Sequence, residues 1–482
     1  MKHTSLFISL FLLLFPLGAH AQYWVTFNMK NSELNGNTIL ALATDQKDTR
    51  WVGTNLGLCR LKGKTWTDFA MFNEKLKNQF VNCLMVDPKG NLWIGTDDYG
   101  VIKFDGSKWT EHTKETKSMN LKFIRDIAVD NNDVKWIGVT LGGLVKFDNK
   151  NWTKYTQSNS GLLSDFILCV TIDAKNNKWI GTNDGLCVFD DNRWTGYTTS
   201  NSGLPHNICP AVLVDKQNVK WIATLGGLCR FDGREWKVYN KTNSPLPSNQ
   251  INDIAFDPSG ALWIATDNGI AVFDLDKGWV VFNKSNTPLP GKVFQNIAID
   301  PQGNKWFGTD FYGLVRFSGQ GIAGRIADEK GNPREGVTLT CGTKTAVTDA
   351  DGRYYIEAAT GASGEVIPSM EGFEFQPARI SFSAINAFRF NQNFTISSGM
   401  VAKGNSSERV MVNPFLAEGY ITITMESPVA EIEFVDASGK SIRTIPQYKN
   451  GNRITISKMP KSNYTLYIRT AKGEKSLKFN LR

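Results

Sequence analysis

Short runs of alternating apolar and polar residues fill most of the chain, and residues 250–282 show one complete unit of this pattern. Its four runs are QINDIAFD, LWIATD, IAVFD and WVVF, and they are separated by PSGA, Asn268-Gly269 and DKG. Alternation with a period of two predicts strands, and Gly or Asn-Gly between the runs supplies the positive φ of tight hairpins. The unit therefore predicts a four-stranded antiparallel sheet.

Tryptophan positions show that this unit repeats. All 14 tryptophans lie between residues 24 and 306, in two series with intervals of 42 or 43 residues and an offset of 27 residues between the series. The first series is Trp51, Trp93, Trp136, Trp179, Trp221, Trp263 and Trp306, and the second is Trp24, Trp66, Trp109, Trp152, Trp194, Trp236 and Trp279. A fixed period with four short strands per unit predicts a seven-bladed β-propeller in which the tryptophans are core residues.

The last unit lacks an outermost strand of its own. After Trp306 the chain runs through Gly313 to Phe317 without another tryptophan, whereas residues 22–27 (QYWVTF) have the sequence of an outermost strand. We expect this N-terminal strand to pair beside residues 313–318, because that pairing closes the ring without an exposed sheet edge.

The segments VDPKGNLWIGTDDYGVIKFDG (86–106) and IDAKNNKWIGTNDGLCVFD (172–190) resemble the two-component regulator propeller repeat. That repeat occurs in periplasmic ligand-sensing regions of bacterial hybrid kinases, and the resemblance extends over seven copies in residues 22–320. It implies a propeller fold. The chain carries no kinase or response-regulator segment, so the sensor role is not implied intact.

The rest of the chain predicts two further β domains. Residues 321–396 resemble a carboxypeptidase-regulatory-like or immunoglobulin-like β-sandwich, residues 397–407 have the composition of a linker, and residues 408–482 resemble the sorting domain of type IX secretion. The predicted fold class is therefore all-β, a seven-bladed β-propeller followed by two small β-sandwich domains. The sorting domain implies the type IX secretion machinery as a partner and a secreted or cell-surface protein.

The N-terminus predicts export. Lys2, an apolar run from Leu6 to Leu17 and Ala19-His20-Ala21 form the pattern of a signal peptide over residues 1–21. No other stretch is apolar enough for a membrane-spanning segment. Residues 405–482 hold 12 basic and 7 acidic residues, an excess of 12 − 7 = +5. This excess is too small to predict nucleic-acid binding.

The seven cysteines do not have the spacing of a disulfide framework or a zinc site. Cys59, Cys187 and Cys229 occupy one repeat position, and Cys83 and Cys169 occupy another. Equivalent positions on separate blades lie too far apart for a disulfide bond. We predict small buried apolar residues.

Candidate catalytic chemistry is scarce. The predicted mature chain has two histidines, His112 and His206, and no nucleophile elbow, phosphate loop or metal-binding motif. The sequence favours a binding module without catalytic residue, cofactor or metal. A polysaccharide lyase or hydrolase using paired carboxylates is the alternative from another class, and a periplasmic sensor component acting through a separate kinase is a third.

A binding face can be located from the hairpins between second and third strands, which emerge on the same face as the outer-to-inner connections. Most of these hairpins are minimal, but those of blades 2 and 7 add acidic and aromatic residues suited to a glycan, peptide or protein ligand. The predicted ligand-binding residues are Asp97, Asp98, Tyr99, Asp310, Phe311 and Tyr312, together with His206 in a connection. Phe123, Phe166 and Phe294 are further connection residues that could contribute.

Overall fold

The structure is a computed structural model of the chain. The described residues are 24–482 except 113–118, 120, 277, 285, 288, 359–360, 371–372, 386–387, 398–399, 402, 405–409, 416–419, 426–428, 437, 449–452, 458–462, 471–472 and 481–482. The predicted signal peptide and Gln22 lie outside the described residues.

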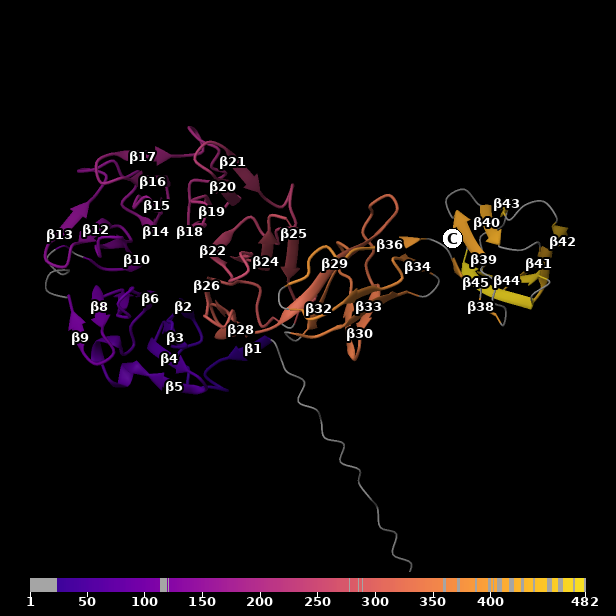
Figure 1. The fold of residues 1–482 in the computed structure, drawn as a ribbon, viewed down its shortest axis with the longest axis horizontal. Helices are drawn as coiled ribbons and strands as arrows, with labels where there is room; N and C mark the ends of the chain where they lie inside the picture. The colour runs from indigo at the N-terminus through magenta and orange to yellow at the C-terminus, as the bar shows by residue number, and fades with distance from the viewer. Residues whose placement is uncertain are drawn as a thin grey trace, which may run out of the picture.

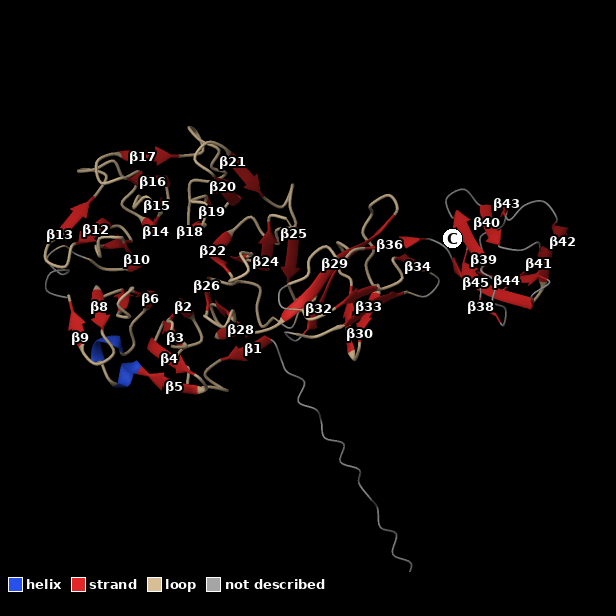
Figure 2. Cartoon of the chain, in the orientation of Figure 1, coloured by secondary structure: helices blue, strands red, loops and turns tan. Residues whose placement is uncertain are grey.

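Seven four-stranded antiparallel sheets surround one axis, with the first strand of each sheet innermost (Figure 1). Blade 1 consists of β2 (Ile39–Thr44), β3 (Thr49–Thr54), β4 (Gly57–Lys62) and β5 (Thr65–Asp68), and blade 2 consists of β6 (Val81–Val86), β7 (Leu92–Thr96), β8 (Val101–Phe104) and β9 (Trp109–Glu111). Blade 3 consists of β10 (Ile124–Val129), β11 (Lys135–Val139), β12 (Gly143–Phe147) and β13 (Trp152–Tyr155). Blade 4 consists of β14 (Ile167–Ile172), β15 (Lys178–Thr182), β16 (Gly185–Phe189) and β17 (Trp194–Tyr197). The fifth and sixth are β18 (Ala211–Val214), β19 (Lys220–Thr224), β20 (Gly227–Phe231) and β21 (Trp236–Tyr239), and β22 (Ile251–Phe256), β23 (Leu262–Thr266), β24 (Gly269–Asp274) and β25 (Gly278–Phe282). The only helices among the described residues are two 3-10 turns after β5, η1 (Phe69–Met71) and η2 (Glu74–Leu76) (Figure 2).

The seventh blade joins the two ends of the propeller, which confirms the predicted closure. Its order is β1-β28-β27-β26, from β26 (Asn296–Ile299), β27 (Lys305–Gly308), β28 (Leu314–Phe317) and β1 (Trp24–Phe27). β1 is antiparallel to β28, with Trp24 opposite Phe317 and Phe27 opposite Leu314. The N-terminal strand thereby covers the sheet edge that the last repeat leaves open.

Small residues allow the blades to approach one another. Gly95 and Gly181 each lie two residues after a first-series tryptophan, where a Cβ would lie 2.5 Å from Ile124 Cγ2 and 2.2 Å from the carbonyl oxygen of Cys209 in the following blade. A larger residue would push the neighbouring innermost strand away. The Trp-Ile-Gly order in the repeat therefore reflects close packing between blades.

The two tryptophan series occupy different depths. The first series is buried between blades, as predicted. The second series lies at the outer strands and, apart from the buried Trp24, is only half-buried. In blades 2 to 6 these outer indoles stack on a phenylalanine of the same blade, as in the pair Phe231–Trp236 with ring centroids 4.1 Å apart. The outer tryptophans thus cover the rim of the core.

All seven cysteines are free, and all but the half-buried Cys341 are buried. Burial raises the pKa of the thiols of Cys59 and Cys229, in each case to about 12. They pack as small apolar residues, which confirms the interpretation from their spacing.

Two β-sandwiches follow the propeller. The first packs a sheet of β32 (Arg353–Ala358), β29 (Gln320–Asp328), β36 (Phe394–Ser397) and β34 (Glu374–Gln376) on a sheet of β31 (Lys344–Val347), β30 (Thr338–Cys341), β33 (Gly364–Ser369) and β35 (Ile380–Phe382). The second has sheets of β37 (Met400–Val401), β39 (Val410–Phe415), β40 (Tyr420–Met425) and β43 (Arg453–Ser457), and of β38 (Lys403–Gly404), β45 (Gly473–Asn480), β44 (Asn463–Thr470), β41 (Val429–Asp436) and β42 (Ser441–Tyr448). Part of the predicted linker thus forms short strands, because β37 pairs with β39 and β38 pairs with β45.

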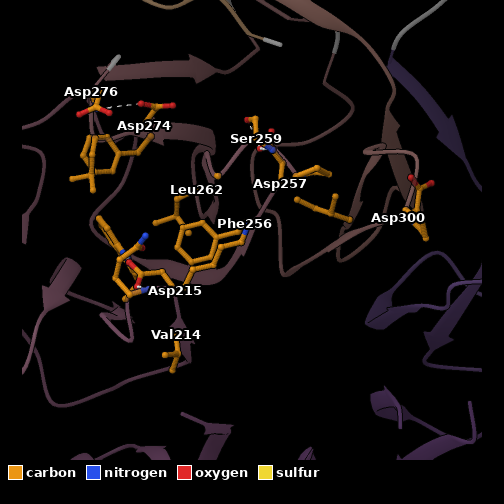
Figure 3. Close-up of a pocket in the computed structure, with 18 of the residues that line it drawn as sticks. Val214, Asp215, Phe256, Asp257, Ser259, Leu262, Asp274, Asp276 and Asp300 are labelled. Atoms are coloured by element: carbon orange, nitrogen blue, oxygen red, sulfur yellow. Dashed lines mark hydrogen bonds between the residues drawn. The ribbon is translucent and has the colours of Figure 1, made fainter. Parts of the chain in front are cut away.

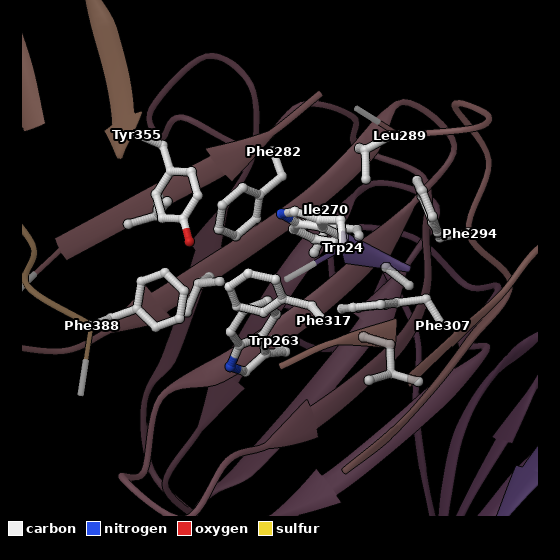
Figure 4. Close-up of a cluster of buried hydrophobic side chains, with 14 of the residues drawn as sticks. Trp24, Trp263, Ile270, Phe282, Leu289, Phe294, Phe307, Phe317, Tyr355 and Phe388 are labelled. Carbon is white, nitrogen blue, oxygen red and sulfur yellow. The ribbon is translucent and has the colours of Figure 1, made fainter. Parts of the chain in front are cut away.

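The first sandwich shares a hydrophobic cluster with blades 6 and 7 (Figure 4). The ring centroids of Phe388 and Trp263 are 5.4 Å apart, and those of Tyr355 and Phe282 are 4.8 Å apart in an edge-on arrangement. Trp24 of the closing strand belongs to the same cluster. Ring closure and sandwich docking therefore depend on one core.

Candidate functional site

The hairpins of the predicted binding face are shaped by a buried threonine. In blade 7, Thr309 Oγ1 donates to the carbonyl of Gly313 at 2.8 Å, and Gly313 adopts a φ of +90°. A Cβ at Gly313 would lie 2.1 Å from the carbonyl oxygen of Phe27, so only glycine fits. The tip of this hairpin presents Phe311 and Tyr312 to solvent, with exposed fractions of 75% and 47%.

Neighbouring side chains fix the blade 7 tip. Gln295 Nε2 donates to Asp310 Oδ2 at 3.1 Å, and Lys284 Nζ lies 5.7 Å from the ring centroid of Tyr312. Gly291 lies under the Tyr312 ring, where a Cβ would be 2.7 Å from Cδ2. The tip is therefore a firmly positioned aromatic surface.

The blade 2 tip is more buried. Asp97 accepts a hydrogen bond from Asn82, Asp98 lies 3.4 Å from Lys122 Nζ, and Tyr99 packs against the core between blades 1 and 2. Burial raises the pKa of Asp97, although the bond from Asn82 opposes this shift. In the described structure no bond or ring contact joins this tip to the blade 7 tip, which lies on the other side of blade 1.

The connection residues have mixed roles. His206 Nδ1 accepts a hydrogen bond from the backbone N–H of Ile208 at 3.0 Å, which stabilises its own turn. Phe123 is exposed and has a φ of +57°, and Phe166 is half-buried. Phe294 is fully buried and lies 5.9 Å from Phe307. Phe294 is therefore a core residue, and the expectation that it contributes to a binding face is wrong.

Two carboxylates that the sequence analysis missed lie at the hairpin end of the axis. Asp126 of β10 accepts hydrogen bonds from the backbone N–H groups of Ile127 at 2.8 Å and of Val170, in the next blade, at 2.7 Å. Asp253 of β22 accepts two equivalent bonds, both of 2.8 Å, from Ile254 and Ile297. Each carboxylate thus joins two innermost strands.

Burial raises the pKa of Asp126 to about 6 and that of Asp253 to about 7, while the backbone hydrogen bonds oppose both shifts. The negative charge of Asp126 raises the pKa of Asp253 further, and the positive charge of Arg125 lowers both. Arg125 also lowers the pKa of Asp97 in blade 2. Arg125 therefore acts on carboxylates of three blades. We call Asp97, Arg125, Asp126 and Asp253 the axial cluster.

A comparison of repeats was the signal that could have found this cluster. The position ten residues before each first-series tryptophan holds Ala41, Cys83, Asp126, Cys169, Ala211, Asp253 and Asn296. The two carboxylates stand out in an otherwise small or amide-bearing set. Arg125 occupies a β-bulge, since the register between β10 and β11 shifts between Ile124 and Asp126. The same bulge recurs in blades 1, 2, 4 and 6, so it belongs to the repeat.

A cavity of about 770 Å³ opens on the opposite face of the propeller (Figure 3). It is lined by the turns between first and second strands of blades 5 to 7, by the turn between β24 and β25, and by Thr44 and Gln46 of blade 1. Among its lining residues are the carboxylates Asp215, Asp257, Asp274, Asp276 and Asp300. A smaller cavity of about 210 Å³ lies beside Lys284, near the Tyr312 tip.

Within the described ranges, no three His, Cys, Asp or Glu side chains gather as a metal-ion site. No helix in the same part of the chain has the length and apolarity needed to cross a membrane.

Comparisons with solved structures show the same fold. The extracellular domain of the putative hybrid two component system BT3049 from B. thetaiotaomicron is similar with a TM-score of 0.58 and 18% identity, over 95% of this chain and 57% of that one. The extracellular domain of BT4673 from the same organism is similar with a TM-score of 0.50 and 17% identity, over 92% and 64%. The chain thus spans less than two thirds of either structure.

A streptogramin B lyase is similar with a TM-score of 0.50 and 15% identity, over 61% of this chain and 96% of the lyase. No curated protein matches the sequence. The family model of the two-component regulator propeller matches residues 75–98 and 245–268. The chain is therefore an all-β protein with a propeller that carries two-component regulator propeller repeats.

Proposed function

We propose that the chain is an exported ligand-binding propeller that holds a glycan, peptide or protein ligand at the hairpin end of its axis. The observation that carries this proposal is the axial cluster, in which the carboxylates of Asp126 and Asp253 join innermost strands at the hairpin end and the charge of Arg125 lowers the pKa of carboxyls in three blades. Perturbed carboxyl pKa values at a recessed site are typical of functional residues. The exposed rings of Phe311, Tyr312 and Phe123 supply apolar surface on the same face.

The chemistry of this face suits a ligand with both polar groups and an apolar surface. Carboxylates and a guanidinium form charge-assisted hydrogen bonds with hydroxyl, amide or charged groups. Aromatic rings contact the C–H face of a sugar or an apolar side chain. In this proposal residues 1–21 direct export, and residues 408–482 deliver the protein through the type IX machinery to the cell surface or medium.

Glycan and peptide arrays test the binding proposal. The wild type is expected to bind a defined subset of ligands, and both Arg125→Ala and the double variant Phe311→Ala/Tyr312→Ala are expected to weaken binding about tenfold or more. Met71→Ala is the matched control, because Met71 is exposed on η1 away from the axis. We prefer Phe311 to Tyr99 as a target, since Tyr99 packs against the core and its loss would also affect stability. Equal binding by all four proteins would reject the site.

A lyase or hydrolase is the second candidate, favoured by the raised pKa values of Asp126 and Asp253, about 6 and 7. A carboxyl with a pKa in this range can exchange protons near neutral pH. Turnover of a polysaccharide panel by the wild type, lost in Asp126→Asn and Asp253→Asn, would establish an enzyme. The absence of turnover together with array binding would support the binding module.

A sensor component is the third candidate, and the similarity to extracellular domains of hybrid two-component systems supports it at the level of fold. Localisation of a chain that lacks residues 408–482 separates it from the delivery proposal. Retention in the periplasm supports the sorting-domain role, and unchanged passage to the surface contradicts it.

A further inference from the structure

Five of the seven blade interfaces contain a cation held on a tryptophan. The residue before each first-series tryptophan reaches back to the tryptophan of the preceding blade when it is Lys or Arg. The distances from the cationic group to the ring centroid are 5.1 Å for Lys135 on Trp93, 4.8 Å for Lys178 on Trp136, 4.9 Å for Lys220 on Trp179, 4.9 Å for Lys305 on Trp263 and 5.2 Å for Arg50 on Trp306.

A carboxylate accompanies the tryptophan at all five of these interfaces, because the aspartate six residues before it accepts a bond from the indole N–H. At four of the five, this aspartate also faces the cation of the next blade. The Lys or Arg nitrogen to carboxylate distances are 3.8 Å for Lys178–Asp130, 3.3 Å for Lys220–Asp173, 3.7 Å for Lys305–Asp257 and 2.9 Å for Arg50–Asp300. At the four lysine interfaces a phenylalanine of the following blade completes the site, as Phe189 does 6.0 Å from Lys178 Nζ, whereas blade 1 has Leu61 at this position. We call this Trp–Asp–Phe arrangement the interblade seat.

The interface between blades 5 and 6 has the seat but no cation from the repeat. Trp221 Nε1 donates to Asp215 at 3.2 Å, and Phe273 lies 5.8 Å from Trp221, within the range of the pairs Trp136–Phe189 at 5.9 Å and Trp263–Phe317 at 5.7 Å. Leu262 stands where the other blades have Lys or Arg. Within the described residues no Lys or Arg pairs with Asp215.

This seat opens into the cavity on the face opposite the hairpins. Asp215, Trp221, Leu262 and Phe273 all line the space of about 770 Å³, and Figure 3 shows Asp215 and Leu262 on the same side of it. Asp215 is half-buried, whereas the aspartates of the four filled seats are buried. Leucine fills the part of the seat that a lysine stem occupies elsewhere. The leucine side chain has no polar group that could bind the carboxylate of Asp215.

The other leucine interface differs. Leu92 stands between blades 1 and 2, where Asp45 accepts bonds from the backbone of Lys47 and Thr49. In the described structure no bond joins Asp45 to the indole of Trp51. The blade 1–2 interface therefore provides a matched comparison with the same substitution and an incomplete seat.

We infer that the seat between blades 5 and 6 binds the side-chain ammonium group of a lysine in a peptide ligand. The protein itself shows at four equivalent seats that a Trp–Asp–Phe arrangement accommodates a lysine ammonium group, those of Lys135, Lys178, Lys220 and Lys305. One carboxylate between two aromatic rings favours an organic cation, because divalent metal ions require several oxygen ligands. The cavity lies on the face opposite the hairpins. It is therefore a second site, independent of the hairpin-face ligand.

The test uses the full-length protein and the tripeptide acetyl-Gly-Lys-Gly-amide, with a norleucine analogue as the uncharged control. The indole N–H resonance of Trp221 is expected to shift in a saturable way with the lysine peptide, at concentrations up to about 10 mM for a single-residue contact. The norleucine peptide is expected to bind about tenfold more weakly or worse, since a bond to a charged group contributes on that order.

Three variants separate the seat from other acidic surfaces. Asp215→Asn is nearly isosteric, keeps an acceptor for Trp221 and should weaken lysine-peptide binding about tenfold. Leu262→Lys supplies a tethered ammonium and should abolish binding while raising the melting temperature. Leu92→Lys adds the same charge at the incomplete seat and should leave binding unchanged. Equal binding of both peptides, undiminished binding by Asp215→Asn or folded Leu262→Lys, or no saturable shift in the wild type would each overturn the inference.

Discussion

At the scale of single residues, the axial carboxylates have structural and electrostatic roles at once. Asp126 and Asp253 each accept two backbone hydrogen bonds and so join neighbouring innermost strands. The same burial that makes these bonds effective raises the pKa of both carboxyls, to about 6 and about 7. Ionisation of Asp126 and Asp253 therefore costs stability near neutral pH.

This cost gives the first prediction, for Asp253→Asn. The folded-state pKa of Asp253, about 7, lies above the value of about 3.9 for an unfolded aspartate. Between about pH 3.9 and about pH 7, the folded protein therefore keeps a proton on Asp253 that the unfolded protein has lost. The resulting stabilisation is fully present below about pH 4 and is lost as pH rises through the folded pKa. Relative to wild type, the free energy of unfolding of Asp253→Asn should increase by about 1–3 kcal/mol from pH 5 to pH 8.

Denaturant unfolding of both proteins at several pH values measures this difference. Asp215→Asn is the control, because it makes the same Asp-to-Asn change at another position of the propeller. A difference between Asp253→Asn and wild type that stays constant from pH 5 to pH 8 would contradict the raised pKa.

At the scale of elements, β1 has more influence than its four residues suggest. Trp24 lies in the core shared by blades 6 and 7, with its ring centroid 4.5 Å from Phe317 and 5.3 Å from Phe282. Because β1 comes from the N-terminal end of the propeller and β28 from the other, their pairing joins the two ends of the ring. Loss of this strand opens an interface and exposes the edge of β28.

The second prediction follows for Trp24→Ala. Truncation should lower the free energy of unfolding of the propeller by about 3–5 kcal/mol, the usual cost of removing a buried tryptophan. Trp152→Ala, at the equivalent but half-buried position of blade 3, should cost less. Denaturant unfolding followed by fluorescence measures both. Equal costs would show that closure has no special role.

The sequence predicted the elements well because each blade repeats one pattern. Trp93 and Trp136 occupy equivalent places, so their spacing alone gives the number and order of sheets. The hairpin positions do not reveal the axial cluster, because Asp126 and Asp253 lie on innermost strands, at a repeat position that holds Ala, Cys or Asn in the other blades. The closed ring determines which blades face one another across the axis, and no local sequence pattern predicts this.

At the scale of the whole molecule, the first sandwich is docked on the propeller. Tyr355 and Phe388 insert into the aromatic core of blades 6 and 7, so the sandwich has a defined orientation relative to the ring. The strand pattern of residues 321–396 does not predict this contact, because alternation in a strand does not identify the partner of its outward-facing residues.

The third prediction is that Tyr355→Ala/Phe388→Ala releases the sandwich. The radius of gyration from small-angle X-ray scattering should increase, because the contact loses two of the sandwich rings in the shared core. Ile367→Ala, an exposed residue of the same sandwich, is the control and should leave it unchanged. An unchanged radius of gyration in the double variant would mean that other contacts hold the sandwich.

The most direct test of the proposed function is a structure of the protein with the strongest ligand from the glycan and peptide arrays. The proposal predicts ligand density at the hairpin end of the axis, in contact with Arg125 and with Phe311 or Tyr312. Density confined to the opposite face, or to the sandwiches, with these three side chains unchanged and still solvent-exposed, would contradict it.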